Sequence, residues 1–293
     1  MLRPWVAHWI TAVLLCRTMA QYSSDQCSWR GSGLSHESHR RDVEQVYLRC
    51  SQGSLEWLYP TGAIIVNLRP NIEQSSGHRA SLHVCIKAQI HSQGSRVYLE
   101  HEGDLRLLLS DEDQARGAVQ CFSLAGGALF VEAIPQRDIS RRITAFQYEL
   151  VSNQGPGAHM YTYLQTGSVT CKPCSDEEVL MAVCTSDFVG SGTFRGVASA
   201  TNEHSLVVVT LSRLFHQKSG MFAWGGARGR GWRGRVNVPA QCSVHPGEDE
   251  YLLTGSIHFG EAWLGCAPRY KEFLKLYIRA QKAGTNPCQI DTN

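Results

Sequence analysis

The chain has 293 residues, of which 43% are hydrophobic and 18% charged, and its formal net charge is +2. This length allows two ordinary domains with apolar cores, and the near-neutral charge excludes a general nucleic-acid-binding character. Whether its eleven cysteines form disulfide bonds depends on whether the protein resides in an oxidising or a reducing compartment.

The first 20 residues have the form of a secretory signal peptide. Arg3 precedes an apolar run from Trp5 to Leu15, and Ala20 supplies the small residue expected before a cleavage site. The run is too short and too interrupted to span a bilayer. We therefore expect residues 1–20 to be removed, and a secreted, extracellular protein without membrane insertion to begin near Gln21.

Removal of this segment leaves an even number of cysteines. Cys16 lies in the signal peptide, so ten of the eleven cysteines remain, which suits five disulfide bonds and no spare thiol. Arg3 and Arg17 are removed with no acidic residue, so basic and acidic side chains then number 26 each. The sequence thus predicts a disulfide-bonded, nearly neutral extracellular protein.

Short apolar or alternating runs recur about every ten residues in the first half, separated by turns rich in Gly, Pro and Asn. The predicted strands are Val46–Cys50, Leu55–Tyr59, Ala63–Leu68, Leu82–Ile86, Arg96–Glu100, Leu105–Leu109, Ala128–Glu132 and Ile143–Leu150. This spacing is typical of an all-β sandwich, which we assign to residues 21–152. Residues 153–170 lack sustained periodicity and are predicted to be a linker.

The second predicted domain, residues 171–293, begins with three closely spaced cysteines, Cys171, Cys174 and Cys184. Ser175 and Glu178 make an S-x-x-E capping box, which predicts a helix that starts after Cys174 and ends at Cys184. The residues predicted to face inward are Val179, Leu180 and Val183. Because cysteines flank this helix, we expect distant segments to be attached to it.

The Cys171-x-x-Cys174 spacing has three interpretations. A redox pair requires one thiol exposed at a helix N-terminus, and a zinc site requires a second close pair, which the sequence lacks. The third interpretation, that each cysteine pairs with a distant partner, is favoured because the chain has the features of a secreted protein.

Further strands and a second helix are predicted after the cysteine-flanked helix. The strands are Thr185–Val189 and Gly192–Val197, with a bend between them, followed by Leu206–Leu214, Val236–Val238 and Tyr251–His258. Pro268 suits a first helical turn, and Gly284 suits the left-handed residue that ends a helix. The apolar stripe of this helix consists of Tyr270, Phe273, Leu274 and Tyr277.

Six segments resemble the meteorin family. They are Cys27–Leu34, Glu56–Gly62, Asp138–Arg142, Cys171–Asp176, Cys184–Phe188 and Phe259–Arg269, and the run Val46–Asn71 is similar to the meteorin-like branch in particular. The resemblance covers the whole mature chain and all ten of its cysteines. It implies a secreted, hormone-like or cytokine-like factor without enzymatic activity, acting on adipose, immune and neural cells in energy homeostasis, fat-cell differentiation, anti-inflammatory and neurotrophic roles.

Each half also resembles a known module. The first is similar to a CUB sandwich and the second to a netrin-type (NTR) domain, an OB-like barrel with flanking helices. These resemblances imply the disulfide bonds Cys27–Cys50, Cys85–Cys121, Cys171–Cys242, Cys174–Cys266 and Cys184–Cys288. The acidic calcium-binding set of CUB domains is not evident, although Asp138 lies in a suitable loop.

The sequence contains no nucleophile elbow, zinc-protease helix or phosphate-binding loop. His36 and His39 are the nearest histidine pair, but they lie in a polar segment, so no metal site is predicted. No Asn-x-Ser/Thr sequon is present. We therefore predict no catalytic residue, no metal and no cofactor.

The segment Gly225–Arg235 is the most prominent local cluster of positive charge in the sequence. It contains Arg228, Arg230, Trp232, Arg233 and Arg235. The segment could bind heparan sulfate or an acidic receptor face, or it could be a solvated loop made mobile by its glycines.

The sequence is compatible with three classes of function. A secreted signalling factor that acts through a cell-surface receptor, such as a receptor tyrosine kinase, is favoured. The alternative is an extracellular protease inhibitor or matrix-binding module, because some NTR domains inhibit metalloproteases through the free α-amine of their first cysteine. Some 150 residues precede Cys171, so that amine is absent here, and an enzyme is the least favoured class.

Overall fold

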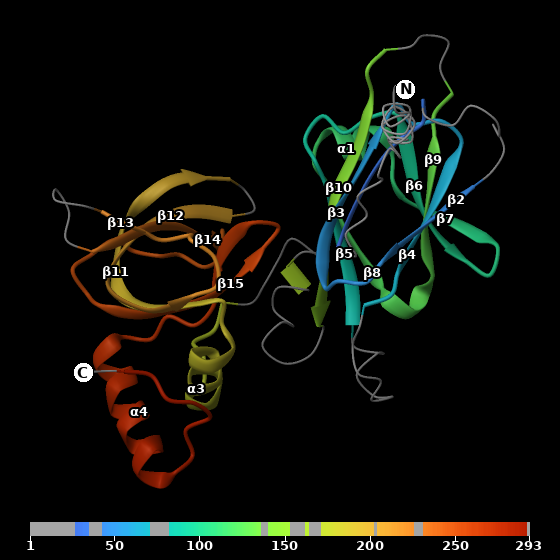
Figure 1. Cartoon of the computed structure of the whole chain (residues 1–293). Coiled ribbons are helices and arrows are strands. Elements are labelled where there is room, and N and C mark those ends of the chain that lie inside the picture. Colours follow the sequence, from blue (N-terminus) through green and yellow to red (C-terminus); the bar gives the residue numbers. More distant parts are fainter. Residues whose placement is uncertain are drawn as a thin grey trace, which may run out of the picture.

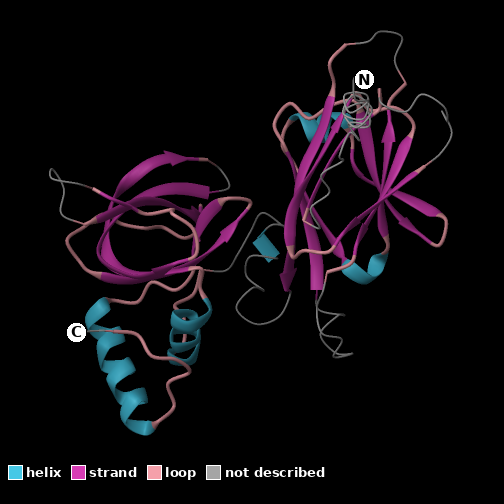
Figure 2. Cartoon of the chain, viewed as in Figure 1, coloured by secondary structure: helices cyan, strands magenta, loops and turns pink. Residues whose placement is uncertain are grey.

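A computed structural model describes residues 27–34, 43–70, 82–135, 140–152, 162–163, 171–201, 204–225 and 231–291. The predicted signal peptide, nearly all of the predicted linker, and His36, His39, Asp138, Arg228 and Arg230 lie outside these residues. Figures 1 and 2 show a mainly β structure, as predicted, with two groups of strands. We call residues 27–152 the first module and residues 171–291 the second module.

The first module contains two sheets of five strands each. One sheet has the order β1 (Ser28–Ser32), β3 (Gln52–Leu58), β10 (Ile143–Ser152), β5 (Leu82–Ala88) and β8 (Val119–Ser123). The other has the order β2 (Glu44–Leu48), β4 (Ala63–Leu68), β9 (Ala128–Ala133), β6 (Ser95–His101) and β7 (Asp104–Leu109). Two short helical segments, α1 (Asp111–Ala115) and η2 (Leu124–Gly126), connect strands between the sheets.

Alternating side chains from both sheets form one apolar core. In β3, for example, Leu55 and Trp57 are buried, and in β4 the buried pair is Ile64 and Val66. Because successive residues of a strand point to opposite faces, this alternation directs one face of each sheet inward. The first module is therefore a sandwich of two facing sheets.

The second module is built around a closed ring of strands. The order is β12 (His204–Gln217), β11 (Phe188–Ala200), β15 (Tyr251–His258), β16 (Glu261–Leu264) and β14 (Trp232–Pro239), and β14 pairs again with β12. The two-residue strand β13 (Ala223–Trp224) pairs with the first two residues of β14. Register shifts within β11 bend this strand, which allows it to pair on both sides as the barrel closes.

Two helices pack beside the barrel (Figure 1). They are α3 (Asp176–Thr185) and α4 (Tyr270–Ala283), and together with β11 and β15 they enclose a second apolar cluster in this module. Ser175 and Glu178 form the predicted capping box of α3. The predicted stripe of α4 packs on the cluster, because Phe273 and Tyr277 are buried and Tyr270 and Leu274 are partly buried against it. The buried face also includes Leu276 and Ala280, which were not predicted.

Several expectations about elements were incomplete. Pro268 precedes α4 instead of occupying its first turn, since Arg269 is the N-cap residue. The predicted strand Val236–Val238 is the end of a longer strand, β14. Elements β1, β8, β13, β16, α1 and η2 were not predicted.

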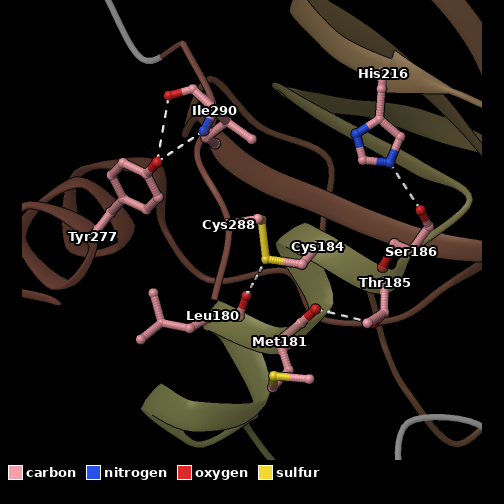
Figure 3. The surroundings of a disulfide bond; sticks show 9 residues. All are labelled: Leu180, Met181, Cys184, Thr185, Ser186, His216, Tyr277, Cys288 and Ile290. Atoms are coloured by element: carbon pink, nitrogen blue, oxygen red, sulfur yellow. Dashed lines mark hydrogen bonds between the residues drawn. A yellow bond between two sulfur atoms is a disulfide. The ribbon is translucent and has the colours of Figure 1, made fainter. Parts of the chain in front are cut away.

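The structure contains five disulfide bonds. They join Cys27 to Cys50, Cys85 to Cys121, Cys171 to Cys242, Cys174 to Cys266, and Cys184 to Cys288. Figure 3 shows the last bond, which attaches the C-terminal tail to α3. The tail also contacts α4, because the backbone N–H of Ile290 donates to the hydroxyl of Tyr277 over 2.8 Å.

Within the part of the chain that the structure describes, no helix is long and apolar enough to cross a membrane.

Candidate functional site

The described part of the arginine-rich segment belongs to strand β14. Trp232 to Arg235 pair with β12, and Arg233 lies opposite Thr210 while Arg235 lies opposite Val208. Both arginines are exposed, whereas Val236 is buried. The two arginines, which are two residues apart in a strand, therefore share the outer face of the barrel.

Gly234, between the two arginines, faces the barrel interior. A Cβ atom at this position would lie 2.4 Å from the ring of Phe222, which is itself 1% exposed. The glycine thus allows the Phe222 ring to close the barrel directly against the β14 backbone. The expectation that residues 225–235 form one glycine-rich loop was wrong for Trp232–Arg235, because here the glycine serves close packing within a strand.

Trp224, on the adjacent strand, lies on the other side of β14 from the two arginines, because its partner Trp232 is one residue from Arg233 and packs against the barrel core. It lies opposite Trp232 in the β13–β14 pair, and the two rings meet edge to face with centroids 5.7 Å apart. Trp224 is 58% exposed, which is unusual for so large an apolar side chain. We call this part of β13 and β14, with Arg233 and Arg235 on its outer side and Trp224 and Trp232 on its other side, the Trp–Arg face.

Charge pairing distinguishes the two arginines of the Trp–Arg face from another exposed arginine of the barrel. Among the described residues, neither Arg233 nor Arg235 forms an ion pair. On β11, by contrast, the exposed Arg195 lies 3.7 Å from Glu248. The arginine-rich pattern of the sequence indicated Arg233 and Arg235 and the Trp232 beside them, but not Trp224, whose proximity depends on the pairing of β13 with β14.

The ionisable groups with shifted pKa values have structural roles. Hydrogen bonds from Ser110 lower the pKa of Asp113, which caps α1. Burial raises the pKa of Tyr270 above its usual 10.0, and its neighbours Arg213 and Glu250 have opposing effects. Both side chains lie at the start of a helix.

A small recess beside the Cys171–Cys242 bond has a volume of about 240 Å³. Its wall is mostly Val, Ser and Ala, with His245 at one side. Most small-molecule sites have volumes of about 300–1,000 Å³ and converging polar groups. Among the described residues, no group of three His, Cys, Asp or Glu side chains is arranged to hold a metal ion. An exposed surface such as the Trp–Arg face is therefore a better candidate site than this recess.

Comparison with known proteins covers both modules. The domain described as "Meteorin-like protein N-terminal domain" matches residues 29–160, and "Meteorin, C-terminal domain" matches residues 173–280. Among solved structures, the full extracellular region of zebrafish Gpr126/Adgrg6 is 12% identical with a TM-score of 0.24, covering 78% of this chain and 31% of that one, a likeness too low to support an argument.

Curated relatives match over nearly the whole chain. A meteorin-like protein of Danio rerio is 58% identical, covering 100% of both chains. A meteorin-like protein of Homo sapiens is 51% identical, covering 96% of this chain and 88% of the relative. Meteorin of Mus musculus is 40% identical, covering 95% of this chain and 94% of the relative. The chain belongs to the meteorin family.

Proposed function

We propose that this protein is a secreted signalling factor, hormone-like or cytokine-like, that acts through a cell-surface receptor. The observation that carries the proposal is the full-length relationship to meteorin-like proteins. The five disulfide bonds support it, because such bonds persist in oxidising extracellular compartments. A receptor tyrosine kinase on adipose, immune or neural cells is the class of partner to test first.

This proposal includes processing of the N-terminus and an organisation in two domains. Residues 1–20 act as a signal peptide, residues 21–152 form a CUB-like sandwich, residues 153–170 are a linker, and residues 171–293 form an NTR-like domain. The facing sheets and the closed barrel with two flanking helices support these assignments. The five-bond framework predicts that no thiol of the mature chain is labelled under denaturing, non-reducing conditions.

Secretion and receptor binding can be tested together. The full chain is expressed in mammalian cells, the medium is examined for protein that begins near Gln21, and the purified protein is screened against receptor ectodomains. We expect saturable binding to at least one ectodomain, which is lost after reduction and alkylation. Retention of the full-length chain inside the cells, or the absence of any saturable ectodomain or cell-surface binding, would overturn the proposal.

The Trp–Arg face favours a second contact, with sulfated glycans such as heparan sulfate. Arg233 and Arg235 offer two exposed guanidinium groups without acidic partners among the described residues, and guanidinium forks suit the oxygens of anionic groups. Trp224 and Trp232 lie on the other side of β13 and β14, so the glycan contact rests on the two arginines. A matrix-binding role, the alternative to receptor signalling, would use the same surface.

The glycan contact is tested by the double variant Arg233→Gln/Arg235→Gln on a heparin column. Its matched control is Lys271→Gln/Lys275→Gln, which removes two exposed positive charges from α4. We expect the arginine variant to elute at lower salt than the control, because exposed charges act over about 8–10 Å at physiological ionic strength. Equal elution of both variants would show that only net charge matters and would remove the Trp–Arg face as a glycan site.

A further inference from the structure

The turn between β15 and β16 has an unusual residue for its geometry. Phe259 and Gly260 are its two central residues, since His258 pairs with Glu261, and both have positive φ angles of 50° and 76°. A two-residue hairpin with positive φ at both positions is a type I′ turn, which favours Asn, Asp or Gly. A bulky residue at positive φ is an outlier. The turn alone therefore does not explain Phe259.

The side chain of Phe259 leaves its own module and packs on the first one. It is only 9% exposed and forms a separate apolar cluster with Cys85 and Val151, against which Val119 and Cys121 also pack. These four residues lie on β5, β10 and β8 of the sandwich. The Phe259 ring thus lies against the Cys85–Cys121 disulfide bond, and we call these four residues, with Glu149, the socket.

A buried carboxylate fixes the backbone of the turn. Glu149 of β10 is 7% exposed, and it accepts a short hydrogen bond from the backbone N–H of Phe259. Its other oxygen lies 3.0 Å from Nδ1 of His258. A buried carboxylate is costly without partners, and the described side-chain hydrogen bonds of Glu149 both come from this hairpin.

The β15–β16 hairpin makes further contacts at the edge of the socket. Lys87 of β5 lies 3.3 Å from Glu261 and 5.8 Å from the centre of the Phe259 ring. Tyr163, in the described part of the predicted linker, packs on Trp263 of β16 with ring centres 4.8 Å apart. The same hairpin therefore contacts the first module and the segment that connects the modules.

The first module contains a hairpin that serves as an internal comparison. Glu102 and Gly103 connect β6 to β7, with φ angles of 53° and 91°, and His101 pairs with Asp104. Glu102 is exposed and makes no described contact with the second module. Two turns of the same type thus differ in whether their first residue enters another module, which is consistent with a binding role for Phe259.

We propose that the Phe259–Gly260 hairpin is an intramolecular docking element that locks the second module onto the socket of the first. Contacts between domains of one chain are usually small and polar, so relative motion is the ordinary expectation. Here an aromatic side chain, a buried carboxylate and a positive-φ backbone meet at one point. Strained residues persist where their surroundings fix them, commonly at binding sites. The two modules then form one rigid ligand rather than two units joined by a linker.

The decisive variant is Phe259→Asn in the full-length mature protein, with Glu102→Asn as its matched control. Asparagine suits both turns, so each substitution relieves the local backbone. We expect Phe259→Asn to shorten the rotational correlation time, increase the radius of gyration and accelerate reduction of the Cys85–Cys121 bond several-fold. Glu102→Asn leaves all three values unchanged. If Phe259→Asn also retains the wild-type values, the docking role is overturned.

A second variant separates docking from misfolding. Val151→Ser alters the socket from the opposite side, and residues in contact show non-additive effects in a double-mutant cycle. We expect Val151→Ser to release the modules as Phe259→Asn does, and the double variant to add little. Fully additive effects would indicate two unrelated local defects. A wild-type dimer that dissociates on Phe259→Asn would assign the hairpin to a second copy and overturn docking within one chain.

Discussion

The first module is closed by the packing of two sheets, whereas the second attaches helices to a barrel through long-range covalent bonds. In the sandwich, Cys27–Cys50 and Cys85–Cys121 span 23 and 36 residues. In the second module, the three bonds span 71, 92 and 104 residues. The covalent framework of the second module thus reaches almost its whole length.

The position of α3 explains why the second module needs these bonds. This helix has 10 residues, of which Val179 and Val183 are buried. Isolated helices shorter than about 12–15 residues are marginal in water. Cys174 precedes α3 and Cys184 lies in its last turn, so both ends are attached to distant segments. Disulfide bonds here replace packing area that a longer helix would bury.

The largest predicted effect is a difference between the modules on reduction. The chain-entropy relation assigns about 4–5 kcal/mol to each long bond and about 3–4 kcal/mol to each short one, against a typical domain stability of about 5–15 kcal/mol. We expect partial reduction to remove amide-exchange protection from residues 171–291 before residues 27–152. Simultaneous loss of protection in both modules would contradict the comparison.

Core truncation should affect each module separately. Phe146 lies in the sandwich core, 1% exposed, and Phe188 lies in the barrel core, 0% exposed, with its ring 5.1 Å from that of Phe222. Replacement of a buried Phe by Ala costs about 3–5 kcal/mol. In calorimetry, Phe146→Ala should lower the transition of the first module and Phe188→Ala that of the second, while Leu107→Ala, at an exposed position, serves as the control. A uniform shift of both transitions by either variant would show that the modules unfold as one unit.

The sequence was most informative where local patterns determine structure. Alternating residues gave the long strands, and the capping box and cysteines gave α3, because these signals lie within one segment. Strand β1 was missed because it contains Gly31 and pairs in parallel with β3, a partner that follows later in the chain. Strand β16 was missed because its four residues cannot show a period.

The candidate surfaces were less predictable for the same reason. Gly234 was interpreted as a source of mobility, yet its missing side chain accommodates the ring of Phe222, which only the folded barrel brings near. Phe259 follows a predicted strand, but the sequence cannot show that its ring meets Cys85 and Val151 in the other half of the chain.

The capping boxes of the two modules allow a comparison of smaller effects. The hydroxyl groups of Ser110 and Ser175 each accept a hydrogen bond from the backbone N–H three residues later, and the backbone N–H of each serine donates to the carboxylate of Asp113 or Glu178. Loss of such a cap costs about 0.5–2 kcal/mol. We expect Ser175→Ala to increase amide exchange in α3 alone, because disulfide bonds attach both of its ends.

Ser110→Ala should affect more than its own helix. Gln114 in α1 is 1% exposed and donates to the carbonyl of Ser95 over 2.7 Å, while its side-chain oxygen accepts from Ser92 over 3.1 Å. Loosening of α1 therefore disturbs bonds to the β5–β6 connection and to β6. Thermal denaturation should show a loss of about 1–2 kcal/mol for the first module. Exchange confined to α1 would contradict this coupling.

The smallest predicted effect is a pH dependence that belongs to the first module. The hydroxyl of Ser110 donates to Asp113 over 2.6 Å, and Arg116 lies 2.6 Å from the other oxygen; these contacts lower the pKa of Asp113 in the folded state, although burial opposes them. Because the folded pKa lies below the unfolded value of about 3.9, the contribution is present above that pH and is lost as pH falls through the folded pKa. Exposed ion pairs contribute roughly 0.2–1 kcal/mol. We therefore expect Asp113→Asn to reduce the acid-induced loss in the first module's free energy of unfolding by no more than this amount. Asp104→Asn, at an exposed position in the same module, should leave the acid-induced loss of stability unchanged. An equal effect of both substitutions would show that net charge, rather than the cap of α1, determines the acid sensitivity.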